Sequence, residues 1–312
     1  MRQARAGTCT LTLPPARSRD RQGEAAWQGQ TEARTKIGSQ AWFGRGRLRP
    51  TNCEIDPEID LMALVPRTAA GSAKTKPAAR ARELARLDWA AIAEELDSNG
   101  CAVIGPLLEP EVCRSLANLY AREAPFRSHI IMARHGFGRG EYKYFAAPLP
   151  ANVAALRTHL YRPLAAIANR WYEQMRMATR FPAEHAAFLE RCHAAGQTRP
   201  TPLLLRYGPG DYNCLHQDVY GELVFPLQVA VLLSDPATEF TGGEFVLTEQ
   251  RPRMQSRAQV APLRQGEAVI FPVRERPVQG RRGVYRVNMR HGVSRLRSGR
   301  RHTLGIIFHD AR

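Results

Sequence analysis

The chain has 312 residues, 44% of them hydrophobic, and a formal net charge of +16. No apolar run approaches the ~18 residues that a membrane-spanning helix requires. The arginine-bearing start lacks the apolar segment that secretory signals carry. Composition therefore argues against a membrane or secreted protein, and we predict a cytoplasmic location with no membrane partner.

The basic charge is spread over the whole chain. Half of it lies in residues 1–82, and many of the other arginines follow position 250. A basic surface attracts polyanions, chiefly nucleic acid, through the release of counterions. A general bias toward arginine explains the same charge equally well, because no run of lysine and arginine is unbroken. The charge thus leaves nucleic acid as one of two interpretations.

Six cysteines are scattered without a Cys-x-x-Cys pair: Cys9, Cys53, Cys101, Cys113, Cys192 and Cys214. Without a secretory context, such cysteines are predicted to be reduced thiols, several of them buried. Their spacing offers no tetrahedral ligand set, so we predict no structural zinc site.

Residues 1–82 are predicted to form a disordered basic tail. They are rich in Arg, Gly, Ser, Ala, Pro and Gln and have few periodic apolar positions. Met62 begins a segment that would serve equally well as a start. We therefore also consider residues 1–61 to be an over-extended gene model.

Residues 83–200 are predicted to form a helical support and lid region. The longest helical pattern covers residues 152–177. The glycine-rich stretch 136–140 lacks the Lys-Ser/Thr of a phosphate-binding loop, so we predict a mobile loop there. Tyr142 and Tyr144 follow this loop and have two interpretations. They either stack on a nucleobase or pack the lid of the domain.

From Leu203 onward, short apolar runs alternate with Gly, Pro and Asp turns. Strands are predicted at 203–207, 213–218, 223–234, 243–248, 257–263, 267–271, 284–289 and 300–309. Strands at such regular spacing favour a sandwich or barrel over βαβ units. The predicted fold class is α+β, with a double-stranded β-helix (jelly-roll) core in residues 201–312 and packing helices outside it.

The stretch from Arg206 to Asp218 contains the first chemical signal. His216 and Asp218 stand at i and i+2 on predicted extended backbone, so their side chains project from the same face. An imidazole and a carboxylate that converge in this way make up two members of a 2-His-1-carboxylate triad. Such a triad holds Fe(II) and leaves positions open for a cosubstrate and O2.

The second histidine must come from a distant strand. His291 is the best candidate, because it follows a strand-like run and precedes Gly-Val-Ser. His302 and His309 compete with it. His302 is adjacent to Arg301, so strand alternation should turn its side chain to the opposite face.

A cosubstrate with a carboxylate needs a cation in the site. Arg301 lies on the last predicted strand, ten residues after His291, and Thr303 at i+2 shares its face. A guanidinium binds a carboxylate through two parallel hydrogen bonds, and a neighbouring hydroxyl adds another donor. This pair suits the distal carboxylate of 2-oxoglutarate, whereas Arg301 alone would be read as a surface charge.

Residues 201–312 resemble the Fe(II)/2-oxoglutarate-dependent dioxygenase superfamily. The stretches that carry the resemblance are His216-Gln217-Asp218, Thr241-Gly-Gly-Glu-Phe245, Pro262-Leu-Arg-Gln-Gly266 with its continuation to Phe271, and the segment from His291 to Arg301. The spacing from His291 to Arg301 is similar to that of the prolyl-hydroxylase branch. The stretch from Arg206 to Asp218 resembles the AlkB-type nucleic-acid dealkylases. From about Leu87 onward, the chain resembles a bacterial group associated with oxidative demethylation of damaged DNA.

The resemblance implies that the iron ligands are His216, Asp218 and His291. It also implies a cosubstrate site formed by Arg301, Thr303 and Tyr207. The implied cofactors are Fe(2+), 2-oxoglutarate and O2, with ascorbate as a candidate reductant. The role of Tyr207 in contacting 2-oxoglutarate comes from the AlkB-type resemblance alone. The chain departs from that type at Ile307, where the family has a second arginine, and at Leu205, where it has an asparagine.

The implied activity is a dioxygenase that hydroxylates a C–H bond and releases succinate and CO2. One hypothesis is oxidative demethylation of alkylated nucleic acid. The alternative is a hydroxylase of a protein side chain, of the prolyl type, or of a small molecule. A third hypothesis is a non-enzymatic, cupin-like binding module. The sequence makes no prediction of the oligomeric state.

Overall fold

The computed structural model describes residues 84, 86–219 and 221–312. The predictions of a disordered tail in residues 1–82 and of an over-extended gene model in 1–61 therefore lie outside the described residues. None of the described helices is both long enough and apolar enough to cross a membrane.

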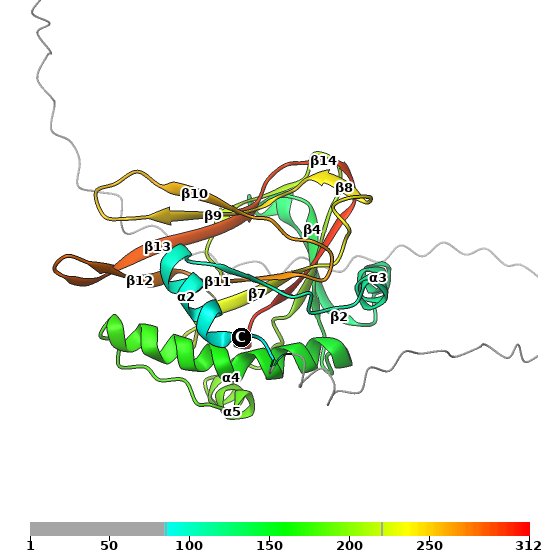
Figure 1. Ribbon diagram of the computed structural model, residues 1–312. Coiled ribbons are helices and arrows are strands. Elements are labelled where there is room, and N and C mark those ends of the chain that lie inside the picture. Colours follow the sequence, from blue (N-terminus) through cyan, green and yellow to red (C-terminus); the bar gives the residue numbers. More distant parts are fainter. Residues whose placement is uncertain (1–83, 85, 220) are drawn as a thin grey trace, which may run out of the picture. The chain divides into compact units, whose positions relative to one another are not determined.

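Two antiparallel sheets dominate the described part (Figure 1). The larger has the order β1 (Ala102–Ile104), β11 (Ala268–Pro272), β7 (Leu227–Leu232), β15 (Arg301–Ile306), β5 (Leu203–Tyr207), β4 (Glu141–Phe145) and β2 (Phe126–Ile131). The second has the order β10 (Arg257–Ala261), β9 (Phe245–Gln250), β13 (Gly283–Val293), β6 (Tyr212–His216) and β3 (Gly138–Arg139), with β12 (Glu275–Gly280) also paired to β13. A separate ladder joins β8 (Phe240–Gly242) to β14 (Leu296–Gly299). Strands from before and after residue 200 share both sheets.

Within the described residues, four α-helices accompany the sheets, together with the 3-10 turns η1 (Leu119–Ala121) and η2 (Met132–Arg134). They are α2 (Trp89–Asn99), α3 (Pro110–Asn118), α4 (Ala151–Gln174) and α5 (His185–Ala194). In α2, the Asp88 carboxylate accepts hydrogen bonds from the first free backbone N–H groups, and Gly100 ends the helix with φ of 78°. The mixture of helices and antiparallel sheets confirms the α+β class.

Helix α4 covers one face of the larger sheet (Figure 1). Its apolar positions recur at helical spacing, and Leu156, Leu160 and Leu164 are fully buried. They belong to the same core cluster as Leu204 of β5 and Leu304 of β15. Each such side chain contributes roughly 1.5–3 kcal/mol of burial free energy, so this layer fixes the sheet that presents the site.

Strand alternation turns the intervening residues of β5 and β15 to the opposite face of the sheet. Arg301 and Thr303 of β15 line a cavity there, while Leu304 packs in the core. The antiparallel register places Arg301 opposite Tyr207, so both side chains reach the cavity from neighbouring strands.

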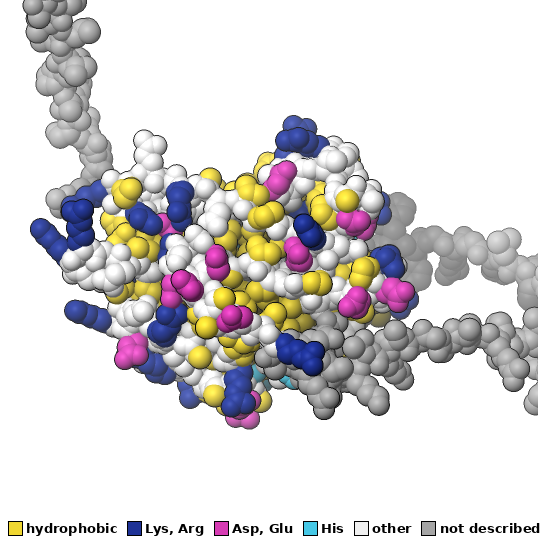
Figure 2. All heavy atoms as spheres, viewed as in Figure 1, with side chains coloured by type: hydrophobic (Ala, Val, Ile, Leu, Met, Phe, Trp, Pro, Cys, Tyr) yellow, Lys and Arg dark blue, Asp and Glu magenta, His cyan; other side chains and the backbone are white. Residues whose placement is uncertain are grey.

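All eight strands predicted after residue 200 overlap observed strands. The strands β8, β12 and β14 were not predicted, and neither was β4 before residue 200. The stretch 136–140, predicted as a loop, contains the two-residue strand β3, which pairs with β6. On the face shown in Figure 2, basic and acidic side chains are interspersed.

Candidate active site

Two histidines meet where β6 and β13 pair. His216 is the last residue of β6, and the register places His291 of β13 directly opposite it. Their ring centroids are 4.2 Å apart. A cross-strand pair on one face of a sheet is close enough for both imidazoles to bind one ion. The local strand pairing therefore brings together two residues that are far apart in the sequence.

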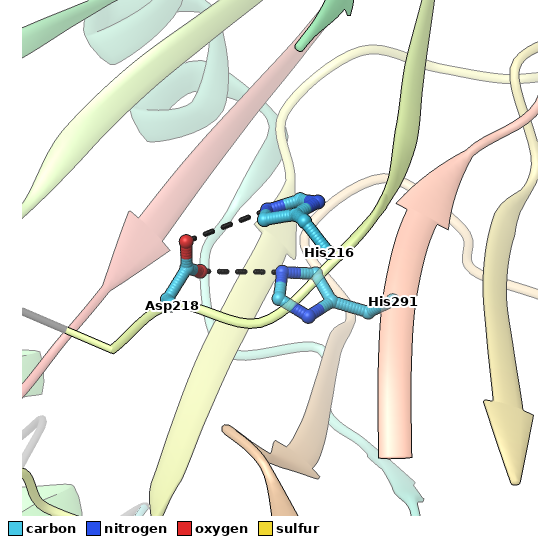
Figure 3. Close-up of side chains that lie close together, drawn as sticks. All are labelled: His216, Asp218 and His291. Atoms are coloured by element: carbon cyan, nitrogen blue, oxygen red, sulfur yellow. Dashed lines mark ion pairs between the residues drawn. The ribbon is translucent and has the colours of Figure 1, made fainter. Parts of the chain in front are cut away.

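Asp218 completes the cluster from the segment that follows β6 (Figure 3). Its Oδ1 lies 3.4 Å from His216 Nε2, and its Oδ2 lies 3.2 Å from His291 Nε2. One ligand atom of each residue lies within 4.8 Å of those of the other two. Among the described residues, these are the three metal-ligating side chains that lie close enough to bind one ion.

The two imidazole rings are held by contacts on their other sides. His216 Nδ1 lies 2.7 Å from the Cys214 carbonyl, to which an Nδ1–H would donate. In the neutral ring this leaves the Nε2 lone pair for a metal. The buried His291 ring packs against Phe271, with centroids 4.6 Å apart, and Phe245 stacks on it at 6.0 Å.

Burial and mutual attraction set the charges of the cluster. Burial opposes the charge on Asp218, but hydrogen bonds from His216 and His291 and their charges hold its pKa well below the usual range. Burial also opposes the charge on His216, yet its bond to Asp218 raises its pKa. Burial lowers the pKa of His291. The site thus offers a carboxylate with two imidazoles.

Gln228 of β7 is a residue of this site that the sequence analysis missed. It is 3% exposed, and its Nε2 donates to Asp218 Oδ2 at 2.9 Å. The same nitrogen lies 3.3 Å from His291 Nε2. A buried amide in this place orients the carboxylate, as groups that support metal ligands do. A lone polar residue inside the apolar run Leu-Gln-Val-Ala-Val-Leu was the available signal.

Arg301 is a buried guanidinium without a matching anion. It is 2% exposed, and its Nη1 donates to Thr303 Oγ1 at 2.6 Å. No carboxylate among the described residues forms an ion pair with it, and burial lowers its pKa to about 10, partly offset by Tyr207 and Glu244. The group stays charged near neutral pH, and a buried charge of this kind calls for an anionic partner.

The glycine pair in Thr241-Gly-Gly-Glu-Phe245 makes room for this arginine. Gly243 has φ of +65°, a conformation that glycine adopts without strain. A Cβ there would lie 3.1 Å from Arg301 Cδ and 2.7 Å from Leu296 Cδ1. The backbone therefore approaches Arg301 more closely than a larger residue would allow.

All six predicted site residues line one cavity of about 340 Å³, which we call the triad cavity. They are Tyr207, His216, Asp218, His291, Arg301 and Thr303. Aromatic and aliphatic side chains supply most of the remaining wall: Phe137, Tyr142, Tyr144, Leu203, Leu205 and Leu215. A mostly apolar cavity with a few convergent polar groups is typical of small-ligand sites.

The competing residues lie elsewhere. The ring of His302 is 6.0 Å from that of Tyr120, outside the triad cavity. The buried His309 accepts a hydrogen bond from the Phe225 backbone through Nδ1. Arg300 is exposed. Of the three candidate histidines, His291 is therefore the one that the fold places beside His216 and Asp218.

The donor set fits the metal and cosubstrate implied by the sequence. Two imidazoles and one carboxylate are the ligands of non-haem Fe(II) sites with open positions. The unpaired guanidinium of Arg301 in the same cavity fits the distal carboxylate of 2-oxoglutarate.

Comparison with known proteins agrees with this chemistry. A family model described as "Oxygenase, catalysing oxidative methylation of damaged DNA" matches residues 140–311. The uncharacterized proteins MT2286 and Rv2227 of Mycobacterium tuberculosis are each 50% identical over 167 residues, which cover 54% of this chain and 72% of each relative.

Two solved structures show weaker likeness. An oxidoreductase of the 2OG-Fe(II) oxygenase family from Burkholderia pseudomallei has a TM-score of 0.44 at 16% identity, covering 72% of this chain and 94% of the other. A Pseudomonas putida prolyl-4-hydroxylase has a TM-score of 0.40 at 16% identity, covering 72% and 99%. These values are too low to carry the assignment.

The family model covers more than half of the chain, and the chain therefore belongs to this oxygenase family. It is therefore an oxygenase, and so an oxidoreductase.

Proposed function

We propose that His216, Asp218 and His291 hold the Fe(II), and that Arg301 and Thr303 bind the distal carboxylate of 2-oxoglutarate. The observation that carries this proposal is the buried, unpaired guanidinium of Arg301 in the cavity that also contains the three converging ligands. Tyr207, opposite Arg301 in the register, closes the wall of the cosubstrate site.

Bound Fe(II), 2-oxoglutarate and O2 supply an oxidative hydroxylation of a C–H bond, with succinate and CO2 as the other products. The residues of this chain position the reactants. Gln228 holds the carboxylate of Asp218, and Phe245 and Phe271 pack against the His291 ring and exclude water. The apolar mouth of the cavity orients the substrate and shields the reacting bond from solvent.

We further propose that the substrate is an N-methylated base of a nucleic acid. The description of the family names damaged DNA, and Phe137, Tyr142 and Tyr144 are among the residues that line the cavity. Aromatic side chains stack on bases whatever the sequence. Hydroxylation of an N-methyl group yields an unstable hydroxymethyl product, which releases formaldehyde and restores the base.

Three structural and cellular expectations belong with this proposal. The two sheets that enclose the triad cavity would form the double-stranded β-helix core in residues 201–312, with residues 83–200 as support and lid. Ascorbate would act as a reductant for the iron. The enzyme would act in the cytoplasm.

The test is formaldehyde and succinate release from single- and double-stranded oligonucleotides that carry N-methylated bases. We expect both products in equal amounts, dependent on Fe(II) and 2-oxoglutarate. Parallel assays with peptide and metabolite fractions detect the alternative hydroxylase. Succinate release with those fractions and none with any methylated oligonucleotide would overturn the proposed substrate.

A further inference from the structure

A second cavity opens beside the triad cavity and is dominated by arginines. It has a volume of about 680 Å³, and we call it the arginine groove. The loops before β6 and around β14 form most of it, and its lining residues are Arg139, Pro209, Gly210, Glu244, Ser294, Arg295, Leu296 and Arg297. It shares no lining residue with the triad cavity.

Two of the guanidinium groups reach the same point of the backbone. A Cβ at Gly210 would lie 3.8 Å from Arg139 Nη1 and 4.0 Å from Arg295 Nη2. Gly210 has φ of +86° and carries no side chain that could cover these groups. Arg139, Arg295 and Arg297 are all exposed, so an anion in solution has direct access to them.

Few carboxylates neutralise these arginines. Arg139 Nε is 3.8 Å from Asp211 Oδ1, a long contact for an ion pair. Among the described residues, no ion pair forms with Arg295 or Arg297. The Glu244 carboxylate accepts a hydrogen bond from Ser294, and this bond is the main cause of the lowered pKa of Glu244. Basic charge therefore exceeds acidic charge in the groove.

The position of the groove relative to the triad cavity is set by strand pairing. Arg139 of β3 is opposite Tyr212 of β6, and β6 runs from Tyr212 to His216. At roughly 3.3 Å per residue this is about 13 Å, a distance that a few nucleotides bridge at roughly 3.4 Å of rise for each phosphate of a strand. A polymer with a base in the triad cavity can thus place its backbone in the groove.

Exposed apolar side chains lie on or beside the same strand, β6. Tyr212 is 38% exposed, Leu215 44% and Phe137 47%, although large apolar side chains are usually buried. The backbone of Phe137 accepts a hydrogen bond from Cys214 N, which places this aromatic residue beside β6. Arginines for phosphates and aromatic faces for bases are the two components of single-strand binding sites.

We propose that the arginine groove binds the phosphodiester backbone of a single-stranded nucleic acid whose target base enters the triad cavity. The inference rests on the proposed function and adds to it the residues that hold the strand. On the face in Figure 2, basic and acidic side chains are mixed, so the net charge of the chain does not by itself locate a binding site for nucleic acid. A defined cluster of guanidinium groups close to the triad cavity is a more specific signal.

The test compares two variants of the full chain with equal loss of charge. R139Q/R295Q/R297Q neutralises the groove, and R114Q/R281Q/R282Q neutralises three exposed arginines outside it. Each is titrated, with Fe(II) and 2-oxoglutarate but without oxygen, into labelled oligonucleotides bearing one N-methylated adenine. Fluorescence anisotropy gives the affinity at several salt concentrations. Deoxyribo- and ribo-oligonucleotides of one sequence form two arms, and an acidic peptide forms a third.

We expect the groove variant to lose at least about tenfold in affinity for both oligonucleotides, and its salt slope to fall by about 2, at roughly 0.7 per phosphate contact of a single strand. The matched variant should change far less. Equal behaviour of the two variants would overturn the groove as the backbone site. So would a groove-dependent loss confined to the acidic peptide.

A phosphate-free substrate separates this proposal from the proposed function. An N-methylated adenine nucleoside should release formaldehyde equally with wild type and with R139Q/R295Q/R297Q. If wild type demethylates the nucleoside and the oligonucleotide while both variants bind the oligonucleotide equally, the groove fails and the function stands. If wild type neither binds the oligonucleotide nor releases formaldehyde, the function fails, and the groove proposal fails with it.

Discussion

The seven-stranded sheet presents one face to helix α4 and the other to the triad cavity, and adjacent residues of one strand serve the two faces. On β15, Leu304 and Ile306 pack in the apolar core, whereas Arg301 and Thr303 line the cavity. All four side chains are buried. Buried residues therefore have two roles in this protein. The apolar ones stabilise the sheet, and the polar ones line the cavity where a ligand would bind.

The two faces of the sheet contribute differently to stability and to ligand binding. Burying an apolar side chain lowers the free energy of the folded state. Burying an unpaired guanidinium raises it unless a ligand supplies the missing charge. Substitutions on the helix-facing side should thus change stability first, and substitutions on the cavity-facing side should change ligand binding first.

The largest expected effect is that of Asp218→Ala, which removes the carboxylate from the cavity-facing cluster. Two imidazoles without the negative charge bind Fe(II) poorly, so we expect iron binding and succinate release to be lost. Calorimetric titration with Fe(II) in the absence of oxygen measures this. The exposed carboxylate variant Glu190→Ala is the control. Retained iron in Asp218→Ala would place the metal elsewhere.

On the helix-facing side, Leu304→Ala should destabilise the fold by about 2–5 kcal/mol, because it leaves a void in a fully buried position. Urea unfolding measures the change. The affinity of the folded fraction for 2-oxoglutarate should stay near that of wild type. A large loss of that affinity with unchanged stability would contradict the division between the two faces.

On the cavity-facing side of the same strand, Arg301→Leu should weaken 2-oxoglutarate binding at least about 30-fold, since truncating one partner of a buried charge pair costs roughly 2–5 kcal/mol. Iron should remain bound. Without 2-oxoglutarate, the free energy of unfolding should be unchanged or higher, because a desolvated charge has been removed. The exposed neighbour in Arg300→Leu is the matched control, and an equal effect there would reassign the anchor.

The smallest of these effects is expected for Gln228→Leu, which removes the amide that holds Asp218. We expect about 10- to 100-fold weaker metal affinity, in line with the loss of groups that orient metal ligands, and a similar unfolding midpoint. Gln279→Leu, on an exposed position of β12, serves as control. Unchanged metal affinity in Gln228→Leu would mean that Asp218 is held by its backbone alone.

Much of this arrangement could be predicted from local sequence. Strand period separates Arg301 from His302, and it was also used to predict His216 and Asp218 on one face. The strand in fact ends at His216, and Asp218 joins the cluster from the segment that follows. The strands that were missed after residue 200 lack such a period. β12 contains Pro277 within a polar run and pairs only with β13, as strands with proline do at sheet edges. β14 buries Leu296 alone, so it offers no alternation to detect.

Other features depended on tertiary structure. The sequence already favoured His291 over His302 and His309, and the register between β6 and β13 shows that it lies beside His216. The role of Gln228 could be recognised only from its hydrogen bond to Asp218 in the structure, because the sequence does not show which residue a single polar side chain in an apolar strand contacts. The arginine groove joins residues from β3, from the turn before β6 and from β14, which no local pattern connects.

The most direct test of the central claim is calorimetric titration of 2-oxoglutarate into the Fe(II)-loaded chain without oxygen. We expect one binding site per chain, lost in Asp218→Ala together with the iron and weakened at least about 30-fold in Arg301→Leu while the iron remains. Binding that is indifferent to both substitutions would contradict the claim that the triad cavity holds iron and cosubstrate together.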